Sequence, residues 1–260
     1  MGKRTSYTPG TFSWVDLATT DAAAAKAFYA GLFGWETEDT DAGGGAVYTM
    51  CRLDGDDVCG IFEMSPELLE RGAPPNWTSY ITVADADAAV ARITELGGEA
   101  IDGAFDVLDA GRMAILKDPQ GAVFAVWEPR ARIGAERVND VGCLTMNELA
   151  TTDVDAARAY YEAAFGWTTE VVDTGPGGPL IVSASNRGML NATLSAGQPG
   201  EPPHWRPYFT VESTAATVER VRDLGGRGLV GPLPIPGGSI AITRDPQGAV
   251  FALFEGRVDP

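Results

Sequence analysis

Two carboxylates occupy the same position of a repeated segment, and they are the residues of this chain best suited to chemistry. Asp16 ends the alternating run Phe12-Ser-Trp-Val-Asp16, and Glu148 ends the run Leu144-Thr-Met-Asn-Glu148. Alternation at period two predicts a half-buried strand, in which every second side chain shares a face. A carboxylate held among apolar neighbours has a perturbed pKa and is a candidate acid or base. We therefore predict Asp16 and Glu148 as catalytic residues.

Other strands should bring further side chains to the same two faces. In the first copy of the repeat the predicted ligand-binding residues are Trp14, Tyr80 and Trp127, and in the second copy they are Met146, His204, Arg206, Tyr208 and Phe254. An Arg beside a carboxylate favours its charged form, and a polar centre inside apolar walls is typical of a small-ligand site. The second copy, with Glu148 at the floor of its cavity, is therefore the favoured functional site.

A structural interpretation of the same residues stays open. Asp16 and Glu148 also suit a role as hydrogen-bond acceptors that stabilise a strand, because a buried carboxylate needs partners. Trp14 and Trp127 suit an apolar core as well as a ligand platform. His204 follows two prolines, as a residue of an exposed loop does.

The repeat itself shows how these side chains are positioned. Leu17-Ala-Thr-Thr-Asp21 recurs as Leu149-Ala-Thr-Thr-Asp153, an offset of 132 (149 − 17), and Asp118-Pro-Gln-Gly recurs as Asp245-Pro-Gln-Gly, an offset of 127 (245 − 118). Thr-Thr-Asp supplies a helix N-cap, and an amphipathic pattern follows it. Two units of about 130 residues indicate a duplicated domain, since solenoids repeat at roughly 20–50 residues.

Each copy contains two modules of a strand, a helix and a hairpin. We expect strands at 12–18, 80–83, 122–128, 207–212 and 249–255, helices at 21–33, 85–96 and 214–224, and hairpins at 46–53/57–63 and 104–109/112–117. The segment after Pro129 is charged and has no periodicity. The predicted organisation is a first domain over 8–130, a linker over 131–139 and a second domain over 140–257.

Composition narrows the classes of partner. The chain has 260 residues and a formal net charge of −17, which argues against nucleic acid because phosphate binding needs clustered Lys and Arg. No stretch approaches the roughly 20 apolar residues of a membrane span, and no export signal is visible. Three cysteines without such a signal suggest reduced thiols. We expect a cytoplasmic monomer or homodimer that binds a small molecule.

The chain resembles the vicinal oxygen chelate superfamily of glyoxalase I, bleomycin-resistance proteins and extradiol dioxygenases. The strand-Thr-Thr-Asp-helix openings, the Phe-Gly-Trp helix ends and both Asp-Pro-Gln-Gly-Ala-Val-Phe strands carry the resemblance, most closely to two-domain actinobacterial members. It implies an α+β fold of two tandem glyoxalase-like domains. In each domain two paired β-α-β-β-β modules would form an open curved mixed sheet around a cavity.

The resemblance also locates the metal ligands of the superfamily. Their positions in this sequence are Trp14, Thr78 and Ala125 in the first domain and Met146, Arg206 and Ala252 in the second. Divalent metal sites need several converging His or carboxylate ligands, which these residues do not supply. We therefore predict no metal and no cofactor.

Three functions remain compatible with the sequence. The first is a metal-free enzyme of lyase or isomerase type that acts on a carbonyl-containing or aromatic metabolite, with Glu148 or Asp16 as base. The second is a non-catalytic protein that sequesters such a ligand, as bleomycin-resistance proteins do. The third is a metal enzyme with displaced ligands, such as Asp16, Glu148 or His204 recruited across domains.

Overall fold

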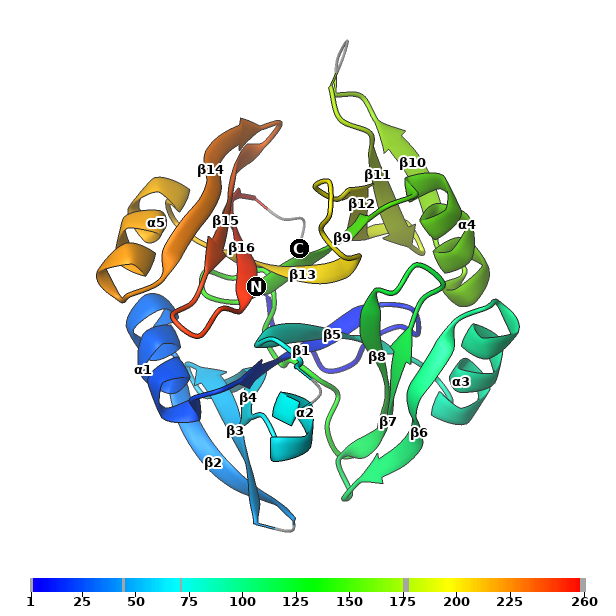
Figure 1. Cartoon of the computed structure of the whole chain (residues 1–260), viewed down its shortest axis with the longest axis horizontal. Helices are drawn as coiled ribbons and strands as arrows, with labels where there is room; N and C mark the ends of the chain where they lie inside the picture. Colours follow the sequence, from blue (N-terminus) through cyan, green and yellow to red (C-terminus); the bar gives the residue numbers. More distant parts are fainter. Residues whose placement is uncertain (1, 44, 71, 175–177, 258–260) are drawn as a thin grey trace.

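The computed structural model describes residues 2–43, 45–70, 72–174 and 178–257, which form two eight-stranded sheets (Figure 1). The order in the first sheet is β2 (Glu36–Gly43), β3 (Ala46–Leu53), β4 (Asp56–Glu63), β1 (Phe12–Thr19), β5 (Asn76–Thr82), β8 (Val123–Pro129), β7 (Gly111–Lys117) and β6 (Glu99–Val107). The second sheet has the equivalent order β10 (Thr168–Val172), β11 (Ile181–Asn186), β12 (Met189–Ala196), β9 (Leu144–Thr151), β13 (His204–Thr210), β16 (Val250–Gly256), β15 (Gly238–Arg244) and β14 (Arg227–Ile235).

Each sheet consists of two β-α-β-β-β modules joined at its centre. The long helices, one to a module and on the outside in Figure 1, are α1 (Ala22–Phe33), α3 (Ala86–Glu95), α4 (Val154–Phe165) and α5 (Thr214–Asp223), and α2 (Pro66–Glu70) is a short addition. The central strands β1 and β5 are antiparallel, as are β9 and β13. Each first strand is also parallel to the last strand of its own module. The predicted α+β fold of four modules is confirmed.

The Phe-Gly-Trp repeats end helices and connect the domains. Gly34 and Gly166 adopt positive φ angles of 77° and 70° after α1 and α4, a conformation that glycine adopts without steric cost. The tryptophan that follows each glycine then donates to the segment before the first strand of the other domain. Trp35 Nε1 lies 2.8 Å from the Gly142 carbonyl oxygen, and Trp167 Nε1 lies 2.7 Å from that of Gly10.

The two Asp-Pro-Gln-Gly turns make a second, reciprocal connection. Asp118 Oδ1 accepts three backbone amides of its own turn, and its Oδ2 accepts from the Tyr161 hydroxyl of the other domain at 3.1 Å. In the same way, Asp245 Oδ1 accepts three backbone amides of its own turn, and its Oδ2 accepts from the Tyr29 hydroxyl at 3.1 Å. Each tyrosine oxygen in turn accepts from an indole, Trp205 Nε1 at 2.9 Å for Tyr161. We call these two series the Trp–Tyr–Asp chains.

The apolar cores on the helical sides are shared between the domains as well. One cluster joins Leu17 and Phe28 of the first domain to Phe209 and Phe251 of the second. The other joins first-domain residues such as Phe124 to second-domain residues such as Leu149 and Tyr161. Each fully buried side chain of this size contributes about 1.5–3 kcal/mol relative to exposure. Neither domain therefore completes its core alone.

The edge strands β2 and β10 lie outside the predicted residue ranges, and both are exposed. Seven of the eight residues of β2 are exposed, and so are four of the five in β10. An edge strand that buries neither face has no apolar alternation to reveal it. β6 also begins earlier than the predicted hairpin, at Glu99 instead of residue 104.

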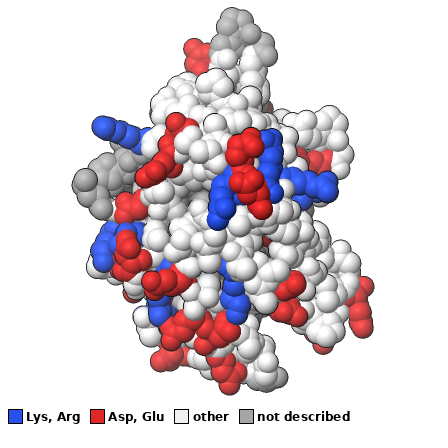
Figure 2. Space-filling view, turned by 90° about the vertical axis from the view of Figure 1, so that its left-hand side faces the viewer, with Lys and Arg blue, Asp and Glu red and all other residues white. Residues whose placement is uncertain are grey.

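Acidic groups set the charge of the surface. The chain has 36 Asp and Glu against 19 Lys and Arg, and Figure 2 shows acidic side chains spread over one face and gathered toward its lower end. No helix in the described ranges is long and apolar enough to cross a membrane. An anionic ligand therefore meets net repulsion except near locally placed arginines.

We expect the Trp–Tyr–Asp chains to stabilise the whole fold. Tyr161→Phe leaves Asp118 Oδ2 and Trp205 Nε1 without their buried partner, and we expect it to lower the free energy of unfolding by about 1–3 kcal/mol in urea titrations. Tyr29→Phe should have a similar effect. Tyr160→Phe is the matched control, because the buried Tyr160 hydroxyl has no hydrogen-bond partner among the described residues. Equal losses for Tyr160→Phe and Tyr161→Phe would contradict this role.

Candidate functional site

Glu148 lies on the inner face of the second sheet, surrounded by three donors. It pairs directly with Arg206 across β9 and β13. Its Oε2 accepts from Arg206 Nη1 at 3.1 Å and from the Tyr208 hydroxyl at 2.6 Å, and its Oε1 accepts from the Ser195 hydroxyl at 2.7 Å. The Glu148 side chain is 15% exposed. The structure thus brings Glu148, Arg206 and Tyr208 together in the register that the sequence predicts.

Arg206 contacts two more polar groups of the same face. Its Nη2 lies 3.4 Å from Glu201 Oε1 and 2.8 Å from His204 Nε2. His204 Nδ1 lies 3.0 Å from the Pro202 carbonyl oxygen, which can only accept, so Nδ1 carries the proton and Nε2 accepts from Arg206. His204 is the first residue of β13, and its contacts make it part of the site instead of a free loop residue.

Met146, Tyr208 and Phe254 lie on the three adjacent strands β9, β13 and β16 that include this polar centre. Met146 pairs with Tyr208 across the strands, and both Met146 and Phe254 are half-buried. Tyr208 itself is buried, and this burial, together with the nearby Glu148 carboxylate, raises its pKa well above the ordinary value of a tyrosine. Tyr208 therefore serves as a hydrogen-bond donor and stays protonated at neutral pH.

Asp16 takes the equivalent place in the first sheet but has different neighbours. Its Oδ2 accepts from the Tyr80 hydroxyl at 2.7 Å and lies 3.4 Å from the hydroxyl of Tyr48, which also accepts from Trp14 Nε1 at 2.9 Å. Thr78 stands opposite Asp16 where Arg206 stands opposite Glu148. Asp16 is 3% exposed, and this burial raises its pKa to about 7.

Segments outside the strands cover this first inner face. Ala135 and Val138 of the predicted linker pack in one apolar cluster with Trp14, Tyr80 and Trp127, and Tyr7 borders it. Several contacts hold this cover in place: Tyr7 hydroxyl to the Ala135 carbonyl oxygen at 2.6 Å, Trp127 Nε1 to the Arg132 carbonyl oxygen at 3.0 Å, Arg132 to Asp57 at 2.5 Å and Arg137 to Asp56 at 2.8 Å. The first face is therefore closed by the chain itself.

Sequence reasoning missed several of these participants. Ser195 sits on β12, in a stretch whose alternation was not assigned to an inner face. Glu201 lies in the Pro- and Gly-rich segment before β13, where no periodicity indicates a direction. Tyr48 on β3 and Tyr7 before β1 are two further participants outside the predicted site. The strand parity of Tyr48 was available as a signal, whereas the position of Tyr7 depends on tertiary packing.

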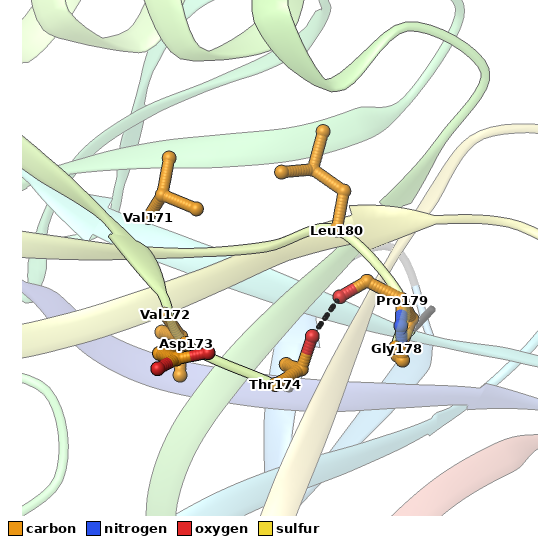
Figure 3. Close-up of a pocket in the computed structure, with 7 residues that line it drawn as sticks. All are labelled: Val171, Val172, Asp173, Thr174, Gly178, Pro179 and Leu180. Carbon is orange, nitrogen blue, oxygen red and sulfur yellow. Dashed lines mark hydrogen bonds between the residues drawn. The ribbon is translucent and has the colours of Figure 1, made fainter. Parts of the chain in front are cut away.

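Two shallow hollows lie elsewhere, at the tips of edge hairpins. One, of about 420 Å³, is lined by Val171–Thr174 and Gly178–Leu180 where β10 leads to β11 (Figure 3). Its Thr174 hydroxyl donates to the Pro179 carbonyl oxygen at 2.8 Å. The other, of about 280 Å³, lies at the equivalent end of β2 and β3. Neither is lined by a predicted site residue.

The residues at the superfamily's metal positions do not fit a metal ion. Trp14, Thr78 and Ala125 lie on adjacent first-sheet strands, and Ala125 pairs with Tyr80. In the second sheet the Arg206 cation occupies one of the three positions. Across the described part of the chain, no three His, Cys, Asp or Glu side chains converge as a metal-binding group.

Comparison with known proteins identifies the family. The family model of the Glyoxalase/Bleomycin resistance protein/Dioxygenase superfamily matches residues 11–126 and 143–253. The chain belongs to this superfamily. CFP32 of Mycobacterium tuberculosis, which is named as a glyoxylase, is 41% identical over 257 residues, covering 98% of each chain. The anthracycline biosynthesis protein DnrV of Streptomyces peucetius is 36% identical over 271 residues, covering 96% of this chain and 95% of DnrV.

Solved structures of the superfamily share the fold. The 2,3-dioxygenase LapB of Pseudomonas sp. KL28 matches with a TM-score of 0.67 at 15% identity, over 96% of this chain and 93% of LapB. A Mn(II)-bound glyoxalase of Novosphingobium aromaticivorans matches with a TM-score of 0.66 at 15% identity, over 96% of this chain and 84% of that one. The predicted superfamily and its tandem duplication are confirmed.

The burial of Asp16 predicts a pH-dependent stability. Its pKa is raised in the folded state, so the carboxyl contributes stability that is fully present below about pH 4 and is lost as the pH rises to about 7. In that interval the free energy of unfolding should fall by up to about 1.4 kcal/mol per pH unit relative to Asp16→Asn, which carries no titrating proton. Denaturant titrations of both proteins across this range measure the difference, and parallel pH profiles would disprove a titrating Asp16.

Proposed function

We propose that the chain binds a small aromatic or carbonyl-containing metabolite on the inner face of the second sheet. We further propose that it converts this metabolite by proton transfer, as a metal-independent enzyme of lyase or isomerase type. The observation that carries the proposal is the Glu148 centre, a half-buried carboxylate with Ser195, Arg206 and Tyr208 around it. Such a combination is the usual anatomy of a small-molecule site.

The difference between the two faces supports the choice of domain. Glu148 is half-buried, whereas Asp16 is buried beneath the linker and Tyr7. A base must come within hydrogen-bond reach of the proton that it abstracts. The proposal therefore assigns the base to Glu148 and ligand contacts to Met146, His204 and Phe254.

The contacts of Glu148 suggest how it would act. Ser195 is the only donor on Oε1 in the described chain, and its hydroxyl can rotate away to let this oxygen face a substrate C–H or O–H group. Arg206 and Tyr208 would hold Oε2 and orient the carboxylate. The proton of a carbon next to a carbonyl passes to Oε1, and its electron pair moves to the carbonyl oxygen as an enolate. Return of the proton at another carbon completes an isomerisation, and loss of a leaving group completes a lyase reaction.

The names of the relatives agree with this class of ligand. CFP32 is named as a glyoxylase, and DnrV and DauV are named as anthracycline biosynthesis proteins. Anthracyclines are planar aromatic compounds that carry carbonyl and hydroxyl groups. Such groups would complement the donors and acceptors of Arg206, Tyr208 and Glu148, while Met146 and Phe254 would pack against the rings.

A second candidate function is sequestration without chemistry. One observation favours it, because Glu148 already accepts three hydrogen bonds and is therefore a well-satisfied anion. A carboxylate held in this way suits the anchoring of a ligand hydroxyl. Mass spectrometry of candidate ligands after incubation separates the two functions: new product that Glu148→Gln fails to form supports catalysis, and unchanged ligand at saturation supports sequestration.

We expect ligand binding to depend on Glu148 and not on Asp16. With quinizarin, a dihydroxyanthraquinone, as the probe, Glu148→Gln should weaken binding about tenfold or more, since it removes a charge-assisted hydrogen bond. Asp16→Asn is the matched control from the closed face and should bind as wild type does. Isothermal titration should give one ligand per chain. Loss of binding in Asp16→Asn alone would show that the site lies in the first domain and that the proposal assigns it to the wrong one.

We also expect the protein to function without a divalent metal. Protein purified without chelator should contain far less than one equivalent of Zn, Fe, Ni or Mn, because Trp14, Ala125, Met146 and Ala252 cannot ligate these ions. Elemental analysis measures the content directly. Near one equivalent per chain, or loss of quinizarin binding after dialysis against a chelator, would support displaced ligands instead.

A further inference from the structure

Arg206 lies between Glu148 and two acceptors that hold the other end of its guanidinium. Its Nη1 contacts Glu148 Oε2 at 3.1 Å, and its Nη2 lies 2.8 Å from His204 Nε2 and 3.4 Å from Glu201 Oε1. An arginine beside a carboxylate often forms a fork, in which two of its nitrogens bind the two carboxylate oxygens. We infer that Glu201 and His204 are positioning residues, which hold Nη2 and so restrict Arg206 to one oxygen of Glu148. The inference rests on the proposed function, in which Oε1 of Glu148 meets the ligand.

Both acceptors are themselves held in place by the segment before β13. Glu201 Oε2 accepts from the Gln198 amide at 3.0 Å, and the Glu201 amide donates to the Gln198 carbonyl oxygen at 2.9 Å. The Glu201 side chain thus closes its own turn with one oxygen and contacts Arg206 with the other. His204 Nδ1 donates to the Pro202 carbonyl oxygen at 3.0 Å, which leaves the Nε2 lone pair for Arg206. Acceptors fixed in this way can orient a long side chain.

The consequence is a difference between the two oxygens of Glu148. Oε2 accepts from Arg206 and from the Tyr208 hydroxyl at 2.6 Å, whereas within the described ranges Oε1 accepts only from the Ser195 hydroxyl at 2.7 Å. A second guanidinium bond would put a charged donor on Oε1, and such bonds are about twice as strong as those between neutral groups. The Ser195 hydroxyl can rotate away from Oε1, whereas a forked guanidinium must break the pair to do so. With Nη2 engaged elsewhere, Oε1 stays available to a ligand.

The two copies of the repeat differ at these three positions together. Residues 201–206 read Glu-Pro-Pro-His-Trp-Arg, and residues 73–78 read Ala-Pro-Pro-Asn-Trp-Thr, at an offset of 128 (201 − 73). Thr78 stands opposite Asp16 as Arg206 stands opposite Glu148. In the first copy Asn76 Nδ2 donates to the Thr78 hydroxyl at 3.4 Å, so the side chain two residues earlier does not serve as an acceptor there. The two acceptors on Nη2 therefore accompany the arginine.

The first experiment compares two double variants that differ in their acceptors. Glu201→Gln with His204→Gln (the Gln pair) keeps an acceptor oxygen in each side chain, whereas Glu201→Leu with His204→Leu (the Leu pair) keeps none. Both pairs lose the carboxylate charge and the imidazole, so a direct contact of His204 with the ligand is lost equally. In isothermal titration the Leu pair should bind quinizarin about fivefold more weakly than the Gln pair, because Arg206 then competes for Oε1. Equal binding by the two pairs would overturn the positioning role.

Dependence on Arg206 separates positioning from a purely structural role. When Arg206→Gln is added to each pair, the difference in quinizarin binding between the pairs should vanish, since the acceptors act only through the guanidinium. A difference that persists without the guanidinium would contradict the inference.

Crystal structures of the two pairs test the geometry without a ligand and without Arg206→Gln. In the Leu pair, Arg206 Nη2 should lie within hydrogen-bond distance of Glu148 Oε1, and in the Gln pair it should contact the introduced amide oxygens. A Leu pair whose guanidinium keeps its single bond to Oε2, or turns away from Glu148, would refute the inference. Failure of wild type to bind quinizarin counts against the proposed function, while these structures still decide whether the two acceptors position Arg206.

Discussion

The Trp–Tyr–Asp chains are the constraint on which the rest of the architecture depends. Each aspartate organises its own Asp-Pro-Gln-Gly turn with Oδ1 and reaches a tyrosine of the other domain with Oδ2. Burial raises the pKa of both aspartates, and the backbone amides oppose that effect by stabilising the charged form. Removing a tyrosine therefore leaves a buried acceptor unmatched at the centre of a shared core. The helical side of each sheet is committed to this interface, so only the inner faces are left for a ligand.

The helical sides of the sheets form the interdomain interface and the inner faces carry the polar centres. This separation explains which parts of the fold and of the site the sequence predicted. The strongest repeats, Phe-Gly-Trp and Asp-Pro-Gln-Gly, proved to be interdomain contacts, and they determine the fold because both copies must make them. Strand parity correctly placed Glu148 opposite Arg206 and beside Tyr208, since side-chain direction in a strand has period two. The closing of the first face was not predictable in this way. Its linker has no periodicity, and Tyr7 and Ala135 meet only through the folded chain.

The site residues are also where the two copies differ. Asp16 faces Thr78 and two tyrosines, whereas Glu148 faces an arginine, a serine and one tyrosine. A carboxylate paired with a tyrosine is common to both faces, as in Asp16–Tyr80 and Glu148–Tyr208. Arg206 and its partners Glu201 and His204 belong to the second face. Duplication thus maintained one architecture while the polar centres diverged.

The chemistry of the two centres gives a physical reason for covering the first face and not the second. Asp16 can take up a proton when it is buried, so covering it requires no unpaired charge inside the protein. Arg206 cannot lose its charge, and Glu148 and Glu201 together outnumber it. Covering that centre would bury an excess carboxylate, and the desolvation of each buried ion amounts to several kcal/mol. A linker that closes over Asp16 is therefore compatible with a stable fold, whereas the Arg206 centre is best stabilised when water or a ligand reaches it.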